Sequence, residues 1–302
     1  MNIFSSTVPE NQEGFAAQDW GLFFGVSVIW GSSFLLIAES LESLTPGVVT
    51  FGRVSLGALT LWVLRMMAHR GHRIEPGDRA RVVVLAVVWV AVPFTLFPLA
   101  QQWINSAVAG LLNGATPVLV AIVSVVFLGA VPQGVQLAGL ALGFVGIVLI
   151  SFGSAGEGSS QARGVVLILI ATACYGFAIN IAPSLQAKYG AIVLMSSVLG
   201  VAAAMNVPYA LVDLGDNEWQ TSSVLALAGL GSVGTGLAYW FMASLVGRVG
   251  SIRASFITYL IPVVSLVLGV WLRDDTVTAA ALTGMPITIV GAFLASRRTT
   301  ER

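Results

Sequence analysis

The chain has 302 residues, of which 57% are hydrophobic and only 9% are charged. Soluble domains carry about 25% charged residues, so this composition argues against a water-soluble protein. The formal net charge is zero, which excludes the strongly basic surface typical of nucleic-acid binding. The composition therefore predicts an all-α polytopic membrane protein with the lipid bilayer as its partner and no nucleic-acid partner.

Apolar runs follow one another along almost the whole chain. A helix needs about 20 mostly apolar residues to cross the hydrocarbon. Dividing the runs at charges and at Asn, Pro and Gly breaks predicts ten transmembrane helices, with ranges 20–38, 46–66, 80–102, 106–128, 134–153, 164–186, 190–212, 221–246, 252–272 and 277–296. No Lys or Arg precedes the first run, so we expect a retained membrane helix there instead of a cleaved signal.

Small residues and prolines repeat in register 145 positions along the chain, without a gap. The pairs include Ser106 and Ser251, Ala109 and Ala254, Pro117 and Pro262, Gly139 and Gly284, and Gly146 and Gly291. This pattern predicts a duplicated unit. The predicted organisation is an N-terminal tail (1–19), a first five-helix repeat (20–153), a connector (154–163), a second five-helix repeat (164–298) and a C-terminal tail (299–302). Because each repeat holds an odd number of helices, the second is predicted to enter the membrane inverted.

The distribution of Lys and Arg predicts the orientation. These residues gather on cytoplasmic loops. With both termini cytoplasmic, the inner segments hold eleven of the fourteen basic residues, namely Arg65, Arg70, Arg73, Arg79, Arg81, Lys188, Arg248, Arg253, Arg297, Arg298 and Arg302. The opposite topology would place all of them outside. We therefore expect a multi-pass membrane protein with both termini in the cytoplasm.

Four stretches carry a family resemblance. WGSSF in the first span, FGRVSLGALTL in the second, the block SAVAGLLNGATPVLVAIVSVVFLG and the glycine-rich LAGLALGFVGIVLIS resemble the EamA branch of the drug/metabolite transporter superfamily. The resemblance covers nearly the whole chain. It implies a ten-helix, inverted-repeat secondary carrier of the inner (plasma) membrane that exports amino acids or other metabolites. The family commonly has a Glu just after the fourth and ninth helices, whereas this chain has Ala130 and Asp275.

Polar and aromatic side chains within the spans are the candidates for substrate binding. Lipid cannot hydrogen-bond a polar group, so such groups face the bundle interior or a wet cavity. Two aromatic pairs are related by the repeat and could line a pocket or simply pack. The predicted substrate-binding residues are Trp30, Ser33, Arg53, Phe94, Gln102, Asn113, Tyr175, Asn180, Tyr239 and Tyr259.

Arg53 is the only charge placed away from the ends of a predicted span. One interpretation is a counter-ion for an anionic or carboxylate substrate. The other is structural: its long stem reaches outward to the interface, or it pairs with Glu39 or Glu42 across the first hairpin.

Pro117 and Pro262 predict matching helix kinks in the two halves. Each proline frees a backbone carbonyl one turn earlier, at Asn113 in the first half. Such carbonyls can hold a substrate where they line a cavity, and otherwise mark a packing kink. Glycines along the fifth and tenth spans allow close helix contact, either within or between the repeats or at a dimer face; they are Gly139, Gly143, Gly146, Gly284 and Gly291.

These features predict a secondary transporter that moves a small metabolite (an amino acid, an amine or a drug-like solute) by alternating access at a midplane site. The alternative is a channel-like facilitator, for which inverted halves of one chain are poorly suited. We expect no enzyme activity, because no His, Asp or Glu lies within a span to supply a nucleophile–base pair. His69 and His72 are too few for a metal site. No cofactor is expected, and the protein is predicted to be a monomer or a homodimer.

Overall fold

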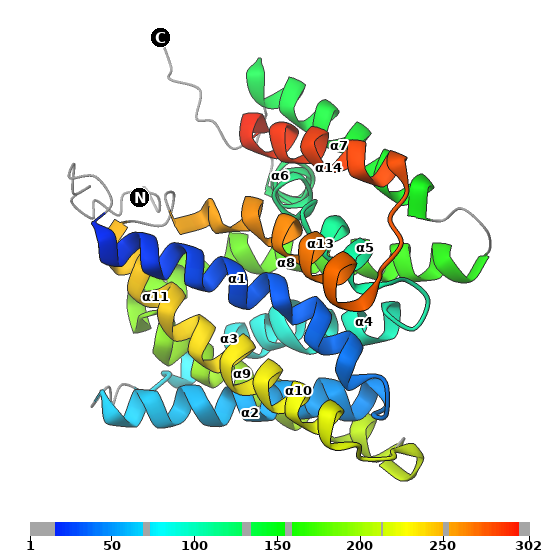
Figure 1. The fold of residues 1–302 in the computed structure, drawn as a ribbon. Helices are drawn as coiled ribbons and strands as arrows, with labels where there is room; N and C mark the ends of the chain where they lie inside the picture. Colours follow the sequence, from blue (N-terminus) through cyan, green and yellow to red (C-terminus); the bar gives the residue numbers. More distant parts are fainter. Residues whose placement is uncertain are drawn as a thin grey trace.

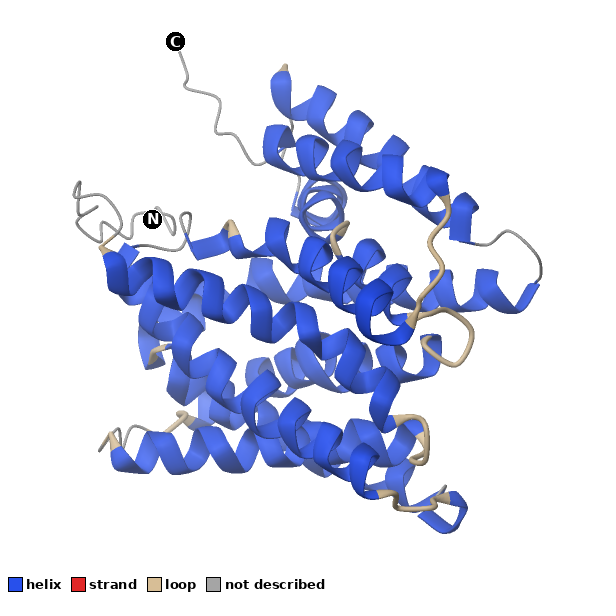
Figure 2. Ribbon diagram, in the orientation of Figure 1, coloured by secondary structure: helices blue, strands red, loops and turns tan. Residues whose placement is uncertain are grey.

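The computed structural model describes residues 16–68, 73–128, 134–154, 159–212, 214–249 and 254–295. The C-terminal tail, most of the N-terminal tail, and Ala130 lie outside these ranges. The described residues form helices and short turns and contain no strand (Figure 2). The predicted all-α class is confirmed.

The helices follow one another with short turns. They are α1 (Ala17–Ser40), α2 (Pro46–Met67), η1 (Pro76–Asp78), α3 (Arg79–Leu85), η2 (Ala86–Ala91), α4 (Val92–Ala100), α5 (Ser106–Asn113), α6 (Thr116–Leu128), α7 (Val135–Ser154), α8 (Ser159–Tyr189), α9 (Ala191–Val212), η3 (Leu214–Asp216), α10 (Thr221–Gly231), η4 (Ser232–Leu237), α11 (Ala238–Val249), α13 (Ile257–Arg273) and α14 (Ala279–Ala295).

The lengths of the apolar helices fit a polytopic membrane protein. Within the described ranges, six helical segments are long and apolar enough to cross a membrane. The pair α5 and α6, bent by 41°, can make a seventh span, and α7, α13 and α14 include shorter apolar helices. Two helix starts differ most from their predictions: α8 begins at Ser159, within the predicted connector, instead of at residue 164, and α13 begins at Ile257 instead of at residue 252. Arg163 does not interrupt α8, because its exposed side chain can extend beyond the apolar region.

Two short π-helical segments interrupt the third and eighth predicted spans. They are η2, between α3 and α4, and η4, between α10 and α11. Their first residues, Ala86 and Ser232, lie within one position of being repeat equivalents. Single-turn π segments within α-helices are found frequently at functional sites. Both breaks are absent from the sequence-based prediction, since neither segment contains proline or a charge.

Helices from the two halves pack against each other across the molecule. α7 lies along α14, α2 packs on α9, α1 on α13, and α6 on α8 (Figure 1). Glycines explain the closest of these contacts: a Cβ added to Gly291 would lie 2.2 Å from the backbone nitrogen of Gly143, and one on Gly146 would lie 2.5 Å from that of Thr288. The predicted glycine-mediated contact is therefore a contact between the halves of one chain.

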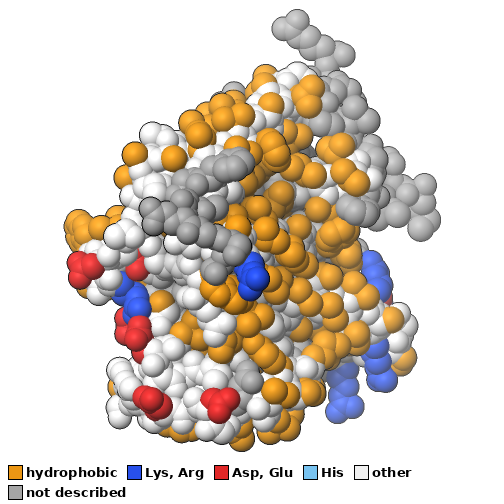
Figure 3. Space-filling model, turned by 90° about the vertical axis from the view of Figure 1, so that its right-hand side faces the viewer, with side chains coloured by type: hydrophobic (Ala, Val, Ile, Leu, Met, Phe, Trp, Pro, Cys, Tyr) orange, Lys and Arg blue, Asp and Glu red, His pale blue; other side chains and the backbone are white. Residues whose placement is uncertain are grey.

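The two ends of the bundle differ in charge. The end that holds the turns 41–45, 101–105, 214–220 and 274–278 is called the acidic end, and carries Glu39, Glu42, Asp216, Glu218, Asp274 and Asp275. The opposite end, called the basic end, carries Arg65, Arg73, Arg79, Arg81, Lys188 and Arg248. In Figure 3, acidic side chains follow one edge of the visible face, most basic ones gather at the other, and apolar side chains lie between them.

The helices α1 and α8 are repeat equivalents and run in opposite directions. Near the start of α1, Asp19 pairs with Arg248 at the basic end, and near its finish Glu39 pairs with Arg273 at the acidic end. By contrast, α8 finishes at the basic end, where Lys188 donates to Asp78 at 2.9 Å.

Candidate functional site

Arg53 is buried in the middle of the bundle. It lies on α2, with 6% of its surface exposed. Its guanidinium carbon is 3.8 Å from the centre of the Phe94 ring on α4, a cation–π contact. Its Nε donates a hydrogen bond of 3.2 Å to the Thr235 hydroxyl on η4. Helices from both halves therefore hold this one cation.

The close approach of α2 and η4 places Thr235 beside Arg53. Small residues permit this approach: a Cβ on Gly57 would lie 2.6 Å from the Thr235 methyl carbon, and one on Gly236 would lie 2.5 Å from Thr60. The Thr235 hydroxyl donates in turn to the carbonyl of Leu230, five residues earlier, at 3.1 Å. The π-helical turn thus fixes the hydroxyl that accepts from Arg53.

Arg53 forms no ion pair with any acidic side chain in the described part of the chain. The two carboxylates suggested by the sequence, Glu39 and Glu42, pair instead with Arg273. The Arg53 side chain is enclosed by neighbouring helices, with 6% of its surface exposed. The pairing with Glu39 or Glu42 is therefore not found, and the contacts of Arg53 are a ring and a hydroxyl.

Further aromatic rings are linked to this cation through Tyr239, which lies near enough to Arg53 to interact with it electrostatically. Trp30 on α1 meets Tyr239 on α11 edge to face, with centroids 5.8 Å apart. Ser33 lies on α1, as Trp30 does. Its hydroxyl faces Gly234 on η4, since a Cβ added to Gly234 would lie 3.3 Å from it. We define the central group as Trp30, Ser33, Arg53, Phe94, Thr235 and Tyr239. Five of these six residues were predicted from the sequence as substrate-binding residues, and the sixth is Thr235.

Tyr175 extends the central group through a neighbouring layer of rings. Phe97 lies 6.1 Å from Tyr175 and 5.6 Å from Phe34 between ring centroids. Tyr175 also lies near enough to Arg53 to interact with it electrostatically. Phe94, Phe97 and Gln101 occupy successive turns of one segment, so the Phe34–Phe97 layer lies between Arg53 and the acidic end.

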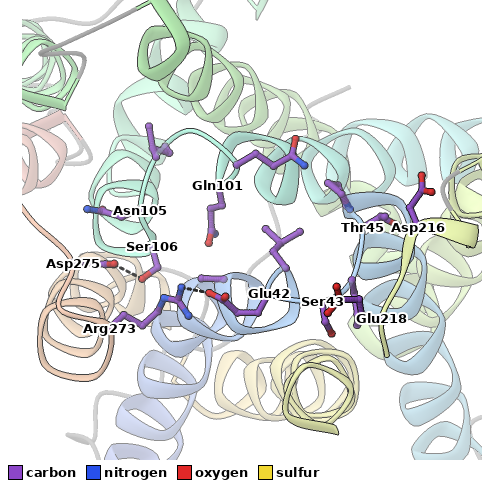
Figure 4. Close-up of a pocket in the computed structure, with 16 residues that line it drawn as sticks. Glu42, Ser43, Thr45, Gln101, Asn105, Ser106, Asp216, Glu218, Arg273 and Asp275 are labelled. Atoms are coloured by element: carbon purple, nitrogen blue, oxygen red, sulfur yellow. Dashed lines mark hydrogen bonds and ion pairs between the residues drawn. The ribbon is translucent and has the colours of Figure 1, made fainter. Parts of the chain in front are cut away.

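A polar cavity of about 570 Å³ opens at the acidic end. Figure 4 shows Gln101 pointing into it, with Arg273 and Glu42 paired on one wall. Both amide atoms of Gln101 are buried without a hydrogen-bond partner among the described residues. The predicted residue Gln102 is exposed and also lines this cavity. Gln102 therefore lies away from Arg53.

A second, mainly apolar cavity of about 390 Å³ lies among α6, α7, α8, α13 and α14. Pro117 and Tyr259 line it, and Tyr259 stacks on Phe256 with centroids 6.0 Å apart. Asn180 lies close by, since its amide oxygen accepts a 3.0 Å hydrogen bond from Ser124. The structure does not bring Tyr259 and Asn180 to the central group.

The two predicted kinks meet in space. A Cβ on Gly114 would lie 3.1 Å from the Pro262 ring, so the break between α5 and α6 packs on Pro262. The Asn113 carbonyl accepts a hydrogen bond of 2.6 Å from the Thr116 hydroxyl. This carbonyl therefore has a local partner. The half-buried Asn113 side chain forms no hydrogen bond with the residues described.

Sequence reasoning missed Thr235, which holds Arg53, and the contact that Asp275 makes at the acidic end. Thr235 was absent from the candidates, although its place in a glycine-rich SVGTGL segment was a signal of close packing. Asp275 was noted only as a departure from the family pattern. Its carboxylate accepts from the Ser106 hydroxyl at 2.5 Å and the Ala107 backbone N–H at 2.9 Å, and so caps α5 from the other half.

Comparison with known proteins identifies the family of this chain. The EamA-like transporter family matches the chain twice, over residues 20–152 and 162–297. The chain belongs to the EamA-like transporter family. The family indicates a membrane transporter of unspecified substrate, which is not a class of enzyme.

The matches to two relatives cover most of this chain and most of each relative. An uncharacterized transporter of Archaeoglobus fulgidus is 26% identical, covering 89% of this chain and 95% of its own. The uncharacterized inner membrane transporter YedA of Escherichia coli is also 26% identical, covering 86% and 84%. A solved crystal structure superposes with a TM-score of 0.63 over 93% of this chain and 97% of its own, at 20% identity, and shows the fold alone.

Proposed function

We propose that this transporter is a secondary carrier that exports a small metabolite across the inner membrane by alternating access. The substrate class is an amino acid, an amine or a drug-like solute, bound at the midplane between the repeats. The observation that carries the proposal is the central group, because its buried cation is held by Phe94 from the first half and Thr235 from the second. A site shared between halves changes its exposure when the halves rock.

The architecture proposed for this mechanism has ten transmembrane helices in two inverted five-helix repeats, with both termini cytoplasmic. This architecture is supported by the helices that the structure describes. They comprise six long segments, one bent pair and three shorter apolar helices, which match the ten predicted spans in number and position. The opposite directions of α1 and α8 support the inversion. The segregation of charge supports an orientation with the basic end inside.

Two cavities support access from both sides. The polar cavity lies at the acidic end, and the apolar cavity lies toward the basic end, beyond the kink at Pro117. The rings of Phe34 and Phe97 separate the polar cavity from Arg53. We propose that these cavities are parts of the two routes to the central group, with Gln102 on one route and Asn113, Asn180 and Tyr259 on the other.

The alternative is a channel-like facilitator without alternating access. Initial uptake rates into proteoliposomes distinguish the two, measured with labelled amino acids, carboxylates and amines over a range of concentrations. A carrier gives saturable uptake that is inhibited by unlabelled substrate. Uptake that rises linearly with concentration, and that no competitor reduces, would favour the channel.

A further inference from the structure

We infer that the substrate carries a carboxylate, and that Arg53 binds it while the rings of the central group hold an apolar or aromatic body. The inference rests on the proposed function and narrows its substrate class. It excludes simple organic amines, which carry a positive charge and no carboxylate.

The first step is the unmet hydrogen-bonding capacity of Arg53. A guanidinium is a planar fork of N–H donors. Among the guanidinium nitrogens, only Nε has a hydrogen-bond partner in the described part of the chain, the Thr235 hydroxyl at 3.2 Å. The side chain is 94% buried, since 6% of its surface is exposed. A buried cation without a counter-charge is unfavourable, so a bound anion would stabilise Arg53 by supplying the negative charge.

The second step is the kind of anion. Arginine binds carboxylates through paired, parallel N–H···O bonds. The terminal nitrogens of Arg53 form no hydrogen bond with the residues that the structure describes, so they can make this pair of bonds. The central group contains a single cation. One positive charge balances one carboxylate, whereas a doubly charged phosphate would keep an unbalanced negative charge inside the membrane. A single carboxylate is therefore the matching group.

The third step is the remainder of the substrate. Phe94 is already covered by the guanidinium at 3.8 Å. Trp30 and Tyr239 meet edge to face, and Tyr175 approaches through Phe97, so ring surface lies close to the cation. Such rings suit an aromatic or apolar body. A free ammonium group is tolerated against a ring face when the same molecule also brings a carboxylate.

The test uses three probes with the same phenyl group: phenylpropionate (carboxylate only), phenylalanine (both groups) and phenethylamine (amine only). Exchange in proteoliposomes is compared for the parent, Arg53→Gln, Arg53→Lys and Arg163→Gln. Arg163 is the matched control, because it is exposed at the start of α8 and its replacement removes the same charge.

We expect the parent and Arg163→Gln to exchange phenylpropionate and phenylalanine but not phenethylamine. Arg53→Gln should lower carboxylate exchange at least about tenfold, because a buried charged partner is lost. Arg53→Lys should weaken it by about tenfold or less, since the charge remains but the paired geometry is lost. Exchange of phenethylamine at a rate equal to phenylpropionate, or unchanged carboxylate exchange by a folded Arg53→Gln protein, would overturn the inference.

A binding readout separates this inference from the transport mechanism. Phenylpropionate should raise the melting temperature of the detergent-solubilised parent, and should not raise that of Arg53→Gln or should do so far less. If Arg53→Gln does not fold, the same comparison is made with Arg53→Lys, which should require a higher ligand concentration for the same shift. Stabilisation of the parent without any saturable transport would uphold the carboxylate site and reject the carrier. Equal stabilisation of the parent and the folded variant would reject the site.

Discussion

At the scale of single residues, Arg53 owes its position to a hydroxyl on the opposite half of the chain. Thr235 accepts from Nε at 3.2 Å and donates to the Leu230 carbonyl, so the hydroxyl is itself fixed. Thr235 contacts the cation and, in this account, not the substrate. It acts as a positioning residue.

Replacing Thr235 by Val removes the acceptor at nearly constant volume. The buried Nε is then left without a partner, at a cost of about 1–3 kcal/mol. We expect the KM for a carboxylate to rise by roughly tenfold, with a smaller change in maximal rate, because the guanidinium is less well oriented. Thr235→Ser retains the hydroxyl and should behave as the parent. Equal KM values for the Val variant and the parent would show that Arg53 needs no anchor.

At the scale of helices, contacts between the halves depend on glycine. Gly291 on α14 faces the backbone of Gly143 on α7, and an added Cβ would lie 2.2 Å from the Gly143 nitrogen. By contrast, an added Cβ on Gly21 of α1 meets nothing within 4 Å. The chain thus offers one crowded and one open glycine for the same substitution.

We predict that Gly291→Ala destabilises the protein by about 1–3 kcal/mol, because the extra methyl group forces α7 and α14 apart. Gly21→Ala should be neutral or stabilising by up to about 1 kcal/mol, since Ala favours a helix. The melting temperatures of both variants are measured in detergent, with the loss of folded protein on heating monitored by size-exclusion chromatography. Similar melting temperatures for the two variants would contradict the tight packing of α7 on α14.

The sequence predicted most helix ranges within a few residues, because apolar length and charged ends are local properties. It did not predict η2, η4 or the cap that Asp275 places on α5, since these depend on which helices meet. The repeat-related aromatic residues Trp30, Phe94 and Tyr239 lie in the central group. The polar candidates Gln102 and Tyr259 line separate cavities, because polarity predicts an interior position and not a particular cavity.

At the scale of the molecule, the two halves meet at one buried cation. The acidic and basic ends lie on opposite sides of it, and each side has its own cavity. In the proposed mechanism both cavities are routes to Arg53, and alternating access requires that only one of them is open to Arg53 at a time. A continuous pore would instead leave the buried guanidinium permanently in contact with water.

The measurement that tests this account most directly is the efflux of labelled phenylpropionate from proteoliposomes, with and without unlabelled phenylpropionate outside. A carrier whose loaded site reorients faster than its empty site gives faster efflux when external substrate is present. We predict such acceleration for the parent and for Arg163→Gln, and its loss in Arg53→Gln. Efflux that external substrate never accelerates, and that is equally fast in Arg53→Gln, would contradict an alternating site centred on Arg53.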